Sequence, residues 1–254
     1  MVNLIEFENT EVIGWEHAIH GMRNPMNSWE KSDSIYGTYW GDINGHKCFD
    51  SDGFNIGTND HDLMKRLCNA GTDHRKFMRM IVVYVDITAP LYWWKEFDTY
   101  KVGTVANSCS TMHKIHEKEF TMDDFSCEHL LNDWNMDEDI VKFYNHSGTA
   151  KKVLDYIITA LNHFRNKYLE ISKQLENDME RDEMLRIQKL KKNYWWQMIQ
   201  LLPTSYNQKR TIMLNYEVLA NIYKSRKNHK LDEWKELCEW IESLPYSELI
   251  IDNE

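Results

Sequence analysis

The chain has 254 residues, of which 42% are hydrophobic, and its formal net charge is −10. A chain of this length and composition can bury a substantial core, and four prolines with ten glycines argue against a chain dominated by disorder. The acidic balance argues against duplex nucleic acid as a partner, because basic residues gather only in short clusters within 189–192 and 224–230.

The first third of the chain predicts two short helices. Apolar residues recur with loosely helical spacing over 13–22, and Pro25 ends that element. Asn59 or Asp60 is expected to cap a second helix. Gly71 then stops this helix, because glycine readily adopts the left-handed conformation that follows a helix end.

A strand and a third helix follow. The β-branched and aromatic segment MIVVYVDI, residues 80–87, is the clearest strand in the sequence. Pro90 opens the helical segment PLYWWKEFDTYK, where proline suits the first turn. The stretch WWKEFDTYKVGTVANSCSTMHK, residues 93–114, then places small, hydroxyl and thiol side chains after two tryptophans. We predict that this stretch forms a pocket wall facing a ligand; a solvated loop is the alternative.

The second half reads as helical. Residues 151–202 carry an apolar seam at spacings of three and four, which is typical of a helix packed along another helix. The seam consists of Leu154, Ile157, Leu161, Phe164, Tyr168, Ile171 and Leu175. The polar segment 176–183 predicts a turn between two antiparallel helices. Further helices are expected over 210–227 and 232–244.

Several chemical motifs are missing from the sequence. It contains no glycine-rich phosphate loop, no dinucleotide-binding fingerprint and no G-x-S-x-G nucleophile elbow. His113 with His116, and Cys127 with His129, are pairs that match no recognised zinc set. We therefore predict no metal site.

The cysteines point to a reducing compartment. Cys48, Cys68, Cys109, Cys127 and Cys238 are odd in number, widely scattered and without C-x-x-C spacing. The first residues lack the basic start and apolar core of a signal peptide, and no apolar run is long enough to span a bilayer. We expect a cytoplasmic protein.

One helix face at the C-terminal end is unusual. Asn215, Leu219, Ile222 and Arg226 follow the spacing i, i+4, i+7, i+11, so we expect them to share one face of a helix. An apolar stripe with polar groups at both ends suits a ligand contact. The alternative is an arginine that simply extends into solvent from a core-facing helix.

Two segments carry a resemblance to a known family. After Pro90 the chain supplies polar residues at fixed spacings, and LLPTSYNQKRTIMLNYEVLANIYKSRKNHKLDEW follows later. The first set is Thr99, Tyr100, Lys101, Thr104, Cys109, Ser110 and Thr111, and the second is Pro203, Asn215, Glu217, Asn221, Arg226, His229 and Trp234. This arrangement resembles the flavin-dependent thymidylate synthase family, with Arg23 matching an early family arginine and residues 120–195 contributing little.

The charges of the family signature are mostly replaced. Its Arg-His-Arg falls on Thr99, Tyr100 and Lys101, and its first serine falls on Thr104. The second serine and the later arginine of the signature fall on Cys109 and Thr111. The arginine of the family's C-terminal Asn-x-Arg motif falls on Glu217. Ordinary thymidylate synthesis is therefore expected to be weak or absent, unless arginines such as Arg23, Arg75 or Arg79 have taken over the lost roles.

The resemblance implies a fold and a set of ligands. The expected fold is α/β (α+β): one mostly helical domain over 1–254, with a small central sheet and two long helices in the C-terminal half. FAD is the implied cofactor, with NADPH and methylene-tetrahydrofolate needed if the family reaction is kept. The implied partners are a small-molecule nucleotide and other copies of the chain in a homotetramer, with no nucleic acid and no membrane.

The resemblance also assigns the site residues. Cys109 and Ser110 fall on the catalytic position, although the family mechanism needs no covalent protein nucleophile. Asn215, Asn221 and His229 are the implied cofactor-binding residues. The implied substrate-binding residues are Lys101, Thr104, Asn107, Thr111 and Arg226.

Two functions remain open at this stage. The chain is expected to be a thymidylate synthase-like nucleotide-binding protein, and as an enzyme it would transfer a C5 group to a pyrimidine nucleotide such as dUMP with flavin. The alternative is a non-catalytic protein that binds or sequesters a nucleotide in the same pocket. Glu217 is hard to reconcile with a diphosphate unless it points away or pairs with Lys209 or Arg210.

Overall fold

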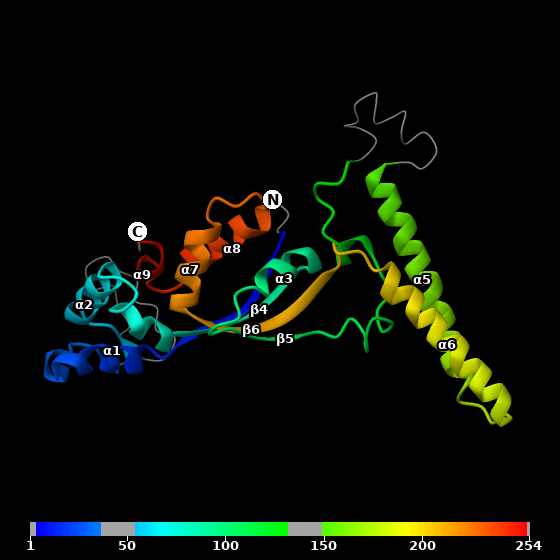
Figure 1. Cartoon of the computed structure of the whole chain (residues 1–254), viewed down its shortest axis with the longest axis horizontal. Helices are drawn as coiled ribbons and strands as arrows, with labels where there is room; N and C mark the ends of the chain where they lie inside the picture. Colours follow the sequence, from blue (N-terminus) through cyan, green and yellow to red (C-terminus); the bar gives the residue numbers. More distant parts are fainter. Residues whose placement is uncertain (1–3, 37–53, 132–148, 253–254) are drawn as a thin grey trace.

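A computed structural model describes residues 4–36, 54–131 and 149–252. A four-stranded antiparallel sheet in the order β1-β4-β6-β5 runs through the body of the molecule (Figure 1). Its strands are β1 (Glu6–Ile13), β4 (Val82–Pro90), β6 (Asn207–Asn215) and β5 (Val105–Ser108). A second sheet pairs the short strands β2 (Ile35–Tyr36) and β3 (Phe54–Asn55).

One face of the large sheet carries the main core. Alternate residues of β4, namely Val83, Val85 and Ile87, are buried, as the two-residue period of a strand requires. The helices α3 (Leu91–Phe97), α7 (Tyr216–Arg226) and α8 (Asp232–Glu242) lie on the same side of this sheet (Figure 1). Buried rings from α3 and α8 meet in this layer: Trp93, Trp94, Phe97 and Trp234.

The opposite face of the sheet is open in the described part of the chain. Tyr84 of β4 lies opposite Met213 of β6, which lies opposite Val105 of β5, so the three form one row. Tyr84 and Val105 are exposed. Asp86 lies in the next row, where it accepts hydrogen bonds from Thr211 and Asn9.

A group of short helices closes one end of the sheet. It contains α1 (Trp15–Arg23), α2 (Thr58–Asn69) and the 3₁₀ segments η1 (Asn24–Met26), η2 (Trp29–Lys31) and η3 (Arg75–Met80), with α9 (Glu248–Ile251) against α2 and α7. The 3₁₀ segment η4 (Met122–Asp124) lies near the other end of the sheet, where the next residue, Phe125, pairs with Tyr206 just before β6.

A long helical hairpin projects from that other end (Figure 1). It consists of α5 (Ala150–Gln174) and α6 (Arg181–Leu201), with the predicted turn between them. Leu154, Ile158 and Leu161 of α5 form a second core with Met198 of α6 and with Phe125. Apart from Met198, the side chains of α6 are exposed or half-buried.

The main features of the predicted fold are confirmed: a mostly helical α+β chain, a small sheet and two long C-terminal helices. The strand predicted over 80–87 and the helices predicted near 13–22, after Pro90 and over 232–244 are present with small shifts of their ends.

The helix predicted over 210–227 begins too early. Residues 207–215 form β6, and the helix α7 starts at Tyr216. Ile212 and Leu214 are buried and alternate with exposed or half-buried neighbours, and β6 pairs with β4 and β5 along its two edges. The ladder bonds on both sides outweigh any local helix preference.

The start of α2 also differs from the prediction. Its N-cap is Gly57, and the side chain of Asp33 accepts hydrogen bonds from the backbone N–H groups of Asn59 and Asp60. Asp33 therefore satisfies the helix start from a distant part of the chain, and Asp60 turns its carboxylate inward.

Candidate functional site

The junction between β6 and α7 brings two of the predicted residues together. Asn215 ends β6 and caps α7, because its Oδ1 accepts a hydrogen bond of 3.1 Å from the Val218 N–H. Gly103 has a φ of +75°, and a Cβ at this position would lie 2.9 Å from Asn215 Nδ2. The next residue, Thr104, has a buried Oγ1 without a partner among the described residues.

Arg226 lies at the other end of α7, in a cluster of polar and aromatic groups. Its Nη1 donates to Glu96 Oε2 and its Nε donates to the Tyr100 hydroxyl, each at 2.9 Å. The guanidinium carbon is 4.4 Å from the ring centre of Trp234, which indicates a cation–π contact. The Arg226 side chain keeps 18% of its surface exposed.

Glu96 is the acceptor at the centre of this cluster. The same Oε2 atom also accepts from Trp234 Nε1 at 3.1 Å, and His229 Nε2 lies 3.6 Å away. The His229 Nδ1 accepts a bond from the Leu231 N–H, so the loop after α7 holds its ring in place. Arg226 and His229 are therefore close together, although the family resemblance assigns Arg226 to the substrate and His229 to the cofactor. We call Glu96, Tyr100, Arg226, His229 and Trp234 the Arg226 cluster.

The small polar run after α3 is exposed in a single copy of the chain. Asn107 lies on β5 opposite Thr211, and all four residues of this edge strand are exposed. Cys109 is exposed, and its N–H donates to the Lys209 carbonyl. The Ser110 Oγ accepts from the N–H groups of Met112 and His113, which gives this hydroxyl a local structural role.

Three other predicted residues make no contact with the Arg226 cluster through any described hydrogen bond or ion pair. Lys101 is exposed, Thr111 is half-buried, and Asn221 is exposed on α7. The structure thus brings together two separate pairs: Arg226 lies with His229, and Asn215 lies near Thr104. Cys109, Ser110 and Thr111 lie apart from both pairs, along the edge of the sheet.

Glu217 has a partner that differs from both sequence-based candidates. It is buried, and its carboxylate lies 2.9 Å from Arg75 Nε and 3.2 Å from Arg75 Nη2. Lys209 instead pairs with Glu8, and Arg210 pairs with Asp98. Glu217 therefore points into the interior, where its charge is compensated by η3, and Arg75 is not free to hold a ligand phosphate.

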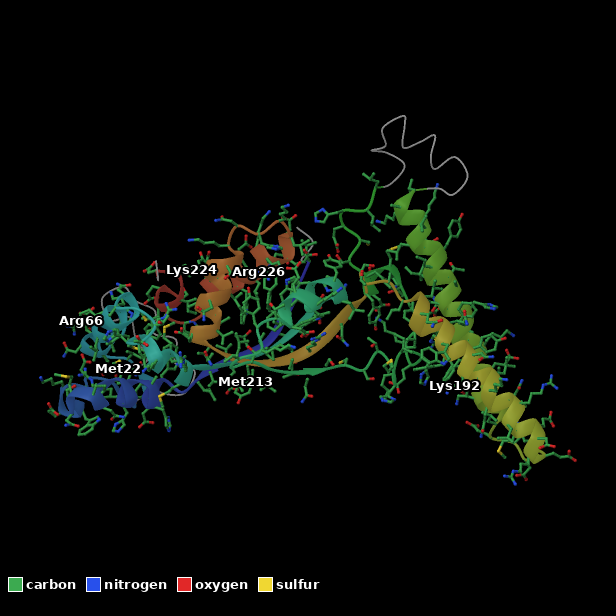
Figure 2. The ribbon with its side chains drawn as sticks, in the orientation of Figure 1. Met22, Arg66, Lys192, Met213, Lys224 and Arg226 are labelled. Atoms are coloured by element: carbon green, nitrogen blue, oxygen red, sulfur yellow. The ribbon has the colours of Figure 1, made fainter. Side chains whose placement is uncertain are left out.

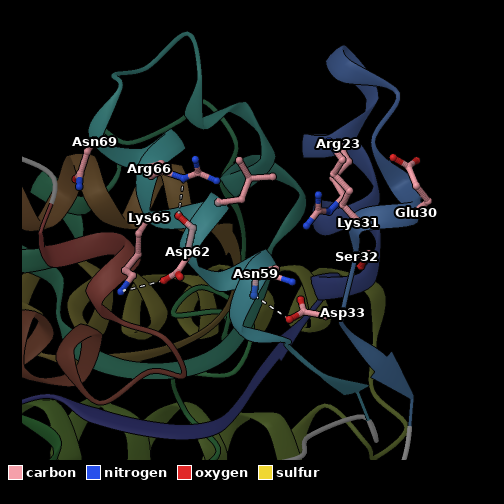
Figure 3. A pocket seen from close by; sticks show the side chains of 11 residues that line it. Arg23, Glu30, Lys31, Ser32, Asp33, Asn59, Asp62, Lys65, Arg66 and Asn69 are labelled. Carbon is pink, nitrogen blue, oxygen red and sulfur yellow. Dashed lines mark hydrogen bonds and ion pairs between the residues drawn. The ribbon is translucent and has the colours of Figure 1, made fainter.

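Two adjoining pockets near α1 and α2 were not predicted from the sequence. The larger, of about 930 Å³, is shown in Figure 3, where Lys65 points toward Asp62 and the backbone N–H of Asn59 donates to Asp33. The smaller, of about 490 Å³, contains His17, His20 and Trp29. Arg23 and Ser32 line both pockets. Arg23 is bound to Asp60 at 2.6 Å, and both of these side chains are buried. Cys109 and Ser110 line neither pocket.

The described residues contain neither a metal-binding cluster nor a membrane-spanning helix. Among them, no group of three or more histidine, cysteine, aspartate or glutamate side chains is placed to hold a metal ion. Within the same ranges, no helix is long and apolar enough to cross a membrane.

The fold defined by this sheet, its helical layer and the hairpin has known counterparts. The chain is similar to the crystal structure of flavin-dependent thymidylate synthase ThyX from Helicobacter pylori complexed with FAD and dUMP. The TM-score is 0.56 at 16% sequence identity, and the alignment covers 97% of each chain.

A second structure of the Helicobacter pylori enzyme with FAD and dUMP gives the same TM-score at 15% identity. No family model matches the sequence, and no curated protein matches it. The comparisons therefore establish a thymidylate synthase-like fold.

Proposed function

We propose that this chain binds a pyrimidine nucleotide, with the Arg226 cluster reading the base. The observation that carries the proposal is the pairing of a partly exposed arginine with a partly exposed carboxylate between two aromatic rings. Arg226 Nη2 donates no hydrogen bond within the described ranges, and Glu96 Oε1 accepts none there. A free donor beside a free acceptor complements a ring in which a carbonyl adjoins an N–H, as in uracil.

The fold comparison supports the same proposal. Both similar structures were determined with FAD and dUMP, and the alignment spans nearly the whole of each chain. Arg226, Asn215 and His229 fall on positions that the family resemblance assigns to nucleotide or cofactor.

Calorimetric titration with dUMP tests this function. Arg226→Ala should weaken binding at least tenfold, because a charge-assisted hydrogen bond contributes roughly 1.5–3 kcal/mol and about 1.4 kcal/mol equals one decade in affinity. Lys224→Ala is the matched control, since Lys224 is an exposed cation of the same helix turn (Figure 2). Equal dUMP affinity for Arg226→Ala and the wild-type protein would reject the proposed site.

The fold comparison suggests FAD as the cofactor, because both similar structures contain it. The side chains at the signature positions, however, match poorly what the FAD diphosphate would need. Of the signature positions, Thr99, Tyr100 and Thr111 are neutral and Lys101 keeps one charge on an exposed side chain, while Glu217 is paired in the interior. The Thr99 hydroxyl already donates to the Glu96 carbonyl. Since a desolvated diphosphate needs fixed cationic donors, these residues do not fit the group.

A flavin-dependent C5 transfer to dUMP is the second candidate, supported by the FAD and dUMP in the two similar structures. The absorption spectrum of purified protein separates the candidates: a flavin spectrum supports the enzyme, and colourless protein that binds dUMP supports the non-catalytic function. We expect dTMP formation with FAD, NADPH and methylene-tetrahydrofolate to stay below ~1 per second, the lower end of usual turnover. Faster turnover would establish the enzyme.

We also propose a single domain that assembles as a homotetramer. Among the described residues, several apolar side chains of the hairpin are exposed, including Tyr156, Leu185, Leu190 and Trp196. A second copy would cover them and would turn the exposed polar run of 93–114 into the predicted pocket wall. Cys68, Cys109, Cys127 and Cys238 are free thiols, which supports a reducing, cytoplasmic setting; Cys48 lies outside the described residues.

A further inference from the structure

A groove lies where the helical hairpin meets the segment that follows β5. Its volume is about 450 Å³, and α5, α6 and residues 112–113 form its walls. The lining residues are Met112, His113, Tyr168, Leu175, Gln188, Lys191, Lys192 and Trp195. Trp195 Nε1 donates to the Met112 carbonyl at 2.8 Å and so ties the two sides together. We call this site the hairpin groove; Figure 2 labels Lys192 on α6.

The hairpin groove is positively charged in an otherwise acidic chain. Neither Asp nor Glu lines it, and Lys191 and Lys192 form no ion pair with a carboxylate of any described residue. Nearby, Arg165 donates to the carbonyls of His116 and Glu117 and to the Asn166 side chain, and it also forms no ion pair with an acidic side chain that the structure describes. Unpaired cations close together repel one another, and an anion between them would relieve that repulsion.

His116 shows the effect of these charges. Its ring packs against Tyr168, with 4.6 Å between ring centres, and its Nδ1 is buried without a partner among the described groups. Burial lowers the pKa of His116, and Lys191, Lys114 and Arg165 lower it further, while Glu117 acts in the opposite direction. His116 is thus within electrostatic range of Lys191 and Arg165, which places these two cations around the same ring.

The walls of the groove are suited to a flat ring. Trp195 offers an aromatic face, and Met112 and Leu175 add apolar surface. Tyr168 completes the wall, with Lys191 Nζ 4.8 Å from its ring centre and the His116 ring packed against it. Stacking of a base on an aromatic side chain contributes roughly 1–3 kcal/mol. The volume falls in the range of small-ligand sites, about 300–1,000 Å³.

We propose that the hairpin groove binds a phosphorylated ligand of mononucleotide size, with the phosphate on Lys191 and Lys192 and the ring against Trp195. This site shares no residue with the Arg226 cluster, and it does not depend on the function proposed for that cluster. The groove recognises its ligand mainly through the phosphate group.

A site-specific signal can test the groove separately. Protein labelled with 5-fluorotryptophan gives one ¹⁹F resonance for Trp195, assigned by its loss in Trp195→Phe. Addition of dUMP should shift this resonance, and deoxyuridine, which lacks the phosphate, should bind at least tenfold more weakly. The shift should persist in Arg226→Ala, which distinguishes the groove from the proposed base-reading site.

Charge reversal gives the matched comparison. Lys191→Glu with Lys192→Glu should weaken dUMP binding at Trp195 at least tenfold, whereas Lys189→Glu, an exposed residue of the same helix outside the groove, should leave it unchanged. Unchanged melting temperatures would show that the variants fold. Equal binding of deoxyuridine and dUMP, or no effect of the double reversal, would overturn the proposal. A single-stranded oligonucleotide that binds a hundredfold more tightly than dUMP would overturn the assignment to a mononucleotide.

Discussion

Asp60 shows how one buried carboxylate organises a distant loop. It accepts hydrogen bonds from the side chains of Ser32 and Ser34 and from Arg23 Nε, the last at 2.6 Å. Burial on its own would raise the pKa of Asp60, yet the bonds from Ser32, Ser34 and Arg23 hold the pKa below its usual value. The anion is therefore the stable form in the folded protein.

Asp60→Asn should lower the free energy of unfolding by about 3–5 kcal/mol near neutral pH, because Arg23 would remain buried without a counter-charge. The loss should shrink in acid: Asp60 contributes stability above its unfolded pKa, near 3.9, and loses it as the pH falls through the lower folded pKa. Urea denaturation at several pH values measures this. Asp62→Asn, on the exposed side of the same helix, should change stability by less than about 0.5 kcal/mol.

Gly14 and Gly71 illustrate two reasons why a position requires glycine: a left-handed backbone conformation and a close approach of another backbone segment. Both have positive φ values, +94° and +100°, which a side chain disfavours. At Gly14 a Cβ would also lie 2.2 Å from the Met80 carbonyl oxygen, whereas at Gly71 nothing lies within 4 Å. Gly14 therefore permits a close backbone approach between β1 and η3.

We expect Gly71→Ala to cost about 1–2 kcal/mol, the usual cost of the left-handed conformation for alanine. Gly14→Ala should cost clearly more, because the Met80 backbone must also move. Thermal unfolding of the two variants side by side gives the comparison, and equal losses would mean that the Met80 backbone yields freely.

At the scale of elements, the ion pair between Arg75 and Glu217 joins η3 to α7. The two residues are 142 positions apart, and both are buried. Neither charge could remain in the interior alone, since an unpaired buried ion carries a penalty of several kcal/mol. The pair explains how an acidic side chain can be buried at position 217, which the family resemblance aligns with an arginine.

Charge exchange tests this pair. Glu217→Arg should be severely destabilising, because it places two guanidinium groups together in the interior. The double variant Arg75→Glu with Glu217→Arg should recover at least half of that loss in urea denaturation. Additive effects of the two substitutions would show that the residues do not interact, since direct partners usually couple by about 0.5–3 kcal/mol.

At the scale of the whole molecule, the hairpin is the part with the least cover. The core of the hairpin is small, and several of its apolar side chains are exposed. The hairpin itself projects away from the helical layer on the sheet (Figure 1). Burial of these apolar side chains against another copy would stabilise an assembly. The acidic net charge of −10 acts against association, so the contact must be built from such apolar surface.

Light scattering after size-exclusion chromatography should therefore show more than one copy for the wild-type chain. Tyr156→Lys with Leu185→Lys should shift the mass toward a single copy, because each introduced ammonium group would be desolvated in the contact. Met26→Lys, which changes an exposed apolar residue of η1, should leave the mass unchanged. A wild-type monomer at micromolar concentration would reject the proposed tetramer.

Elements with local signals could be predicted from the amino-acid sequence. The strand around Val83, the hairpin with its turn near residue 178 and the helix starting at Asp232 follow from periodicity and from helix-start and turn signals within a few residues. The overall fold class followed from these elements and from the family resemblance.

Features that depend on partners far away in the sequence could not be predicted and became visible in the folded chain. Residues 207–215 became a strand because β4 and β5 offered ladder bonds on both sides. Glu217 met Arg75, and Arg226 met Glu96, across 142 and 130 positions of sequence. Such pairings depend on where the folded chain brings side chains into contact, and no local pattern encodes that position; the hairpin groove, formed from three separate segments, arises for the same reason.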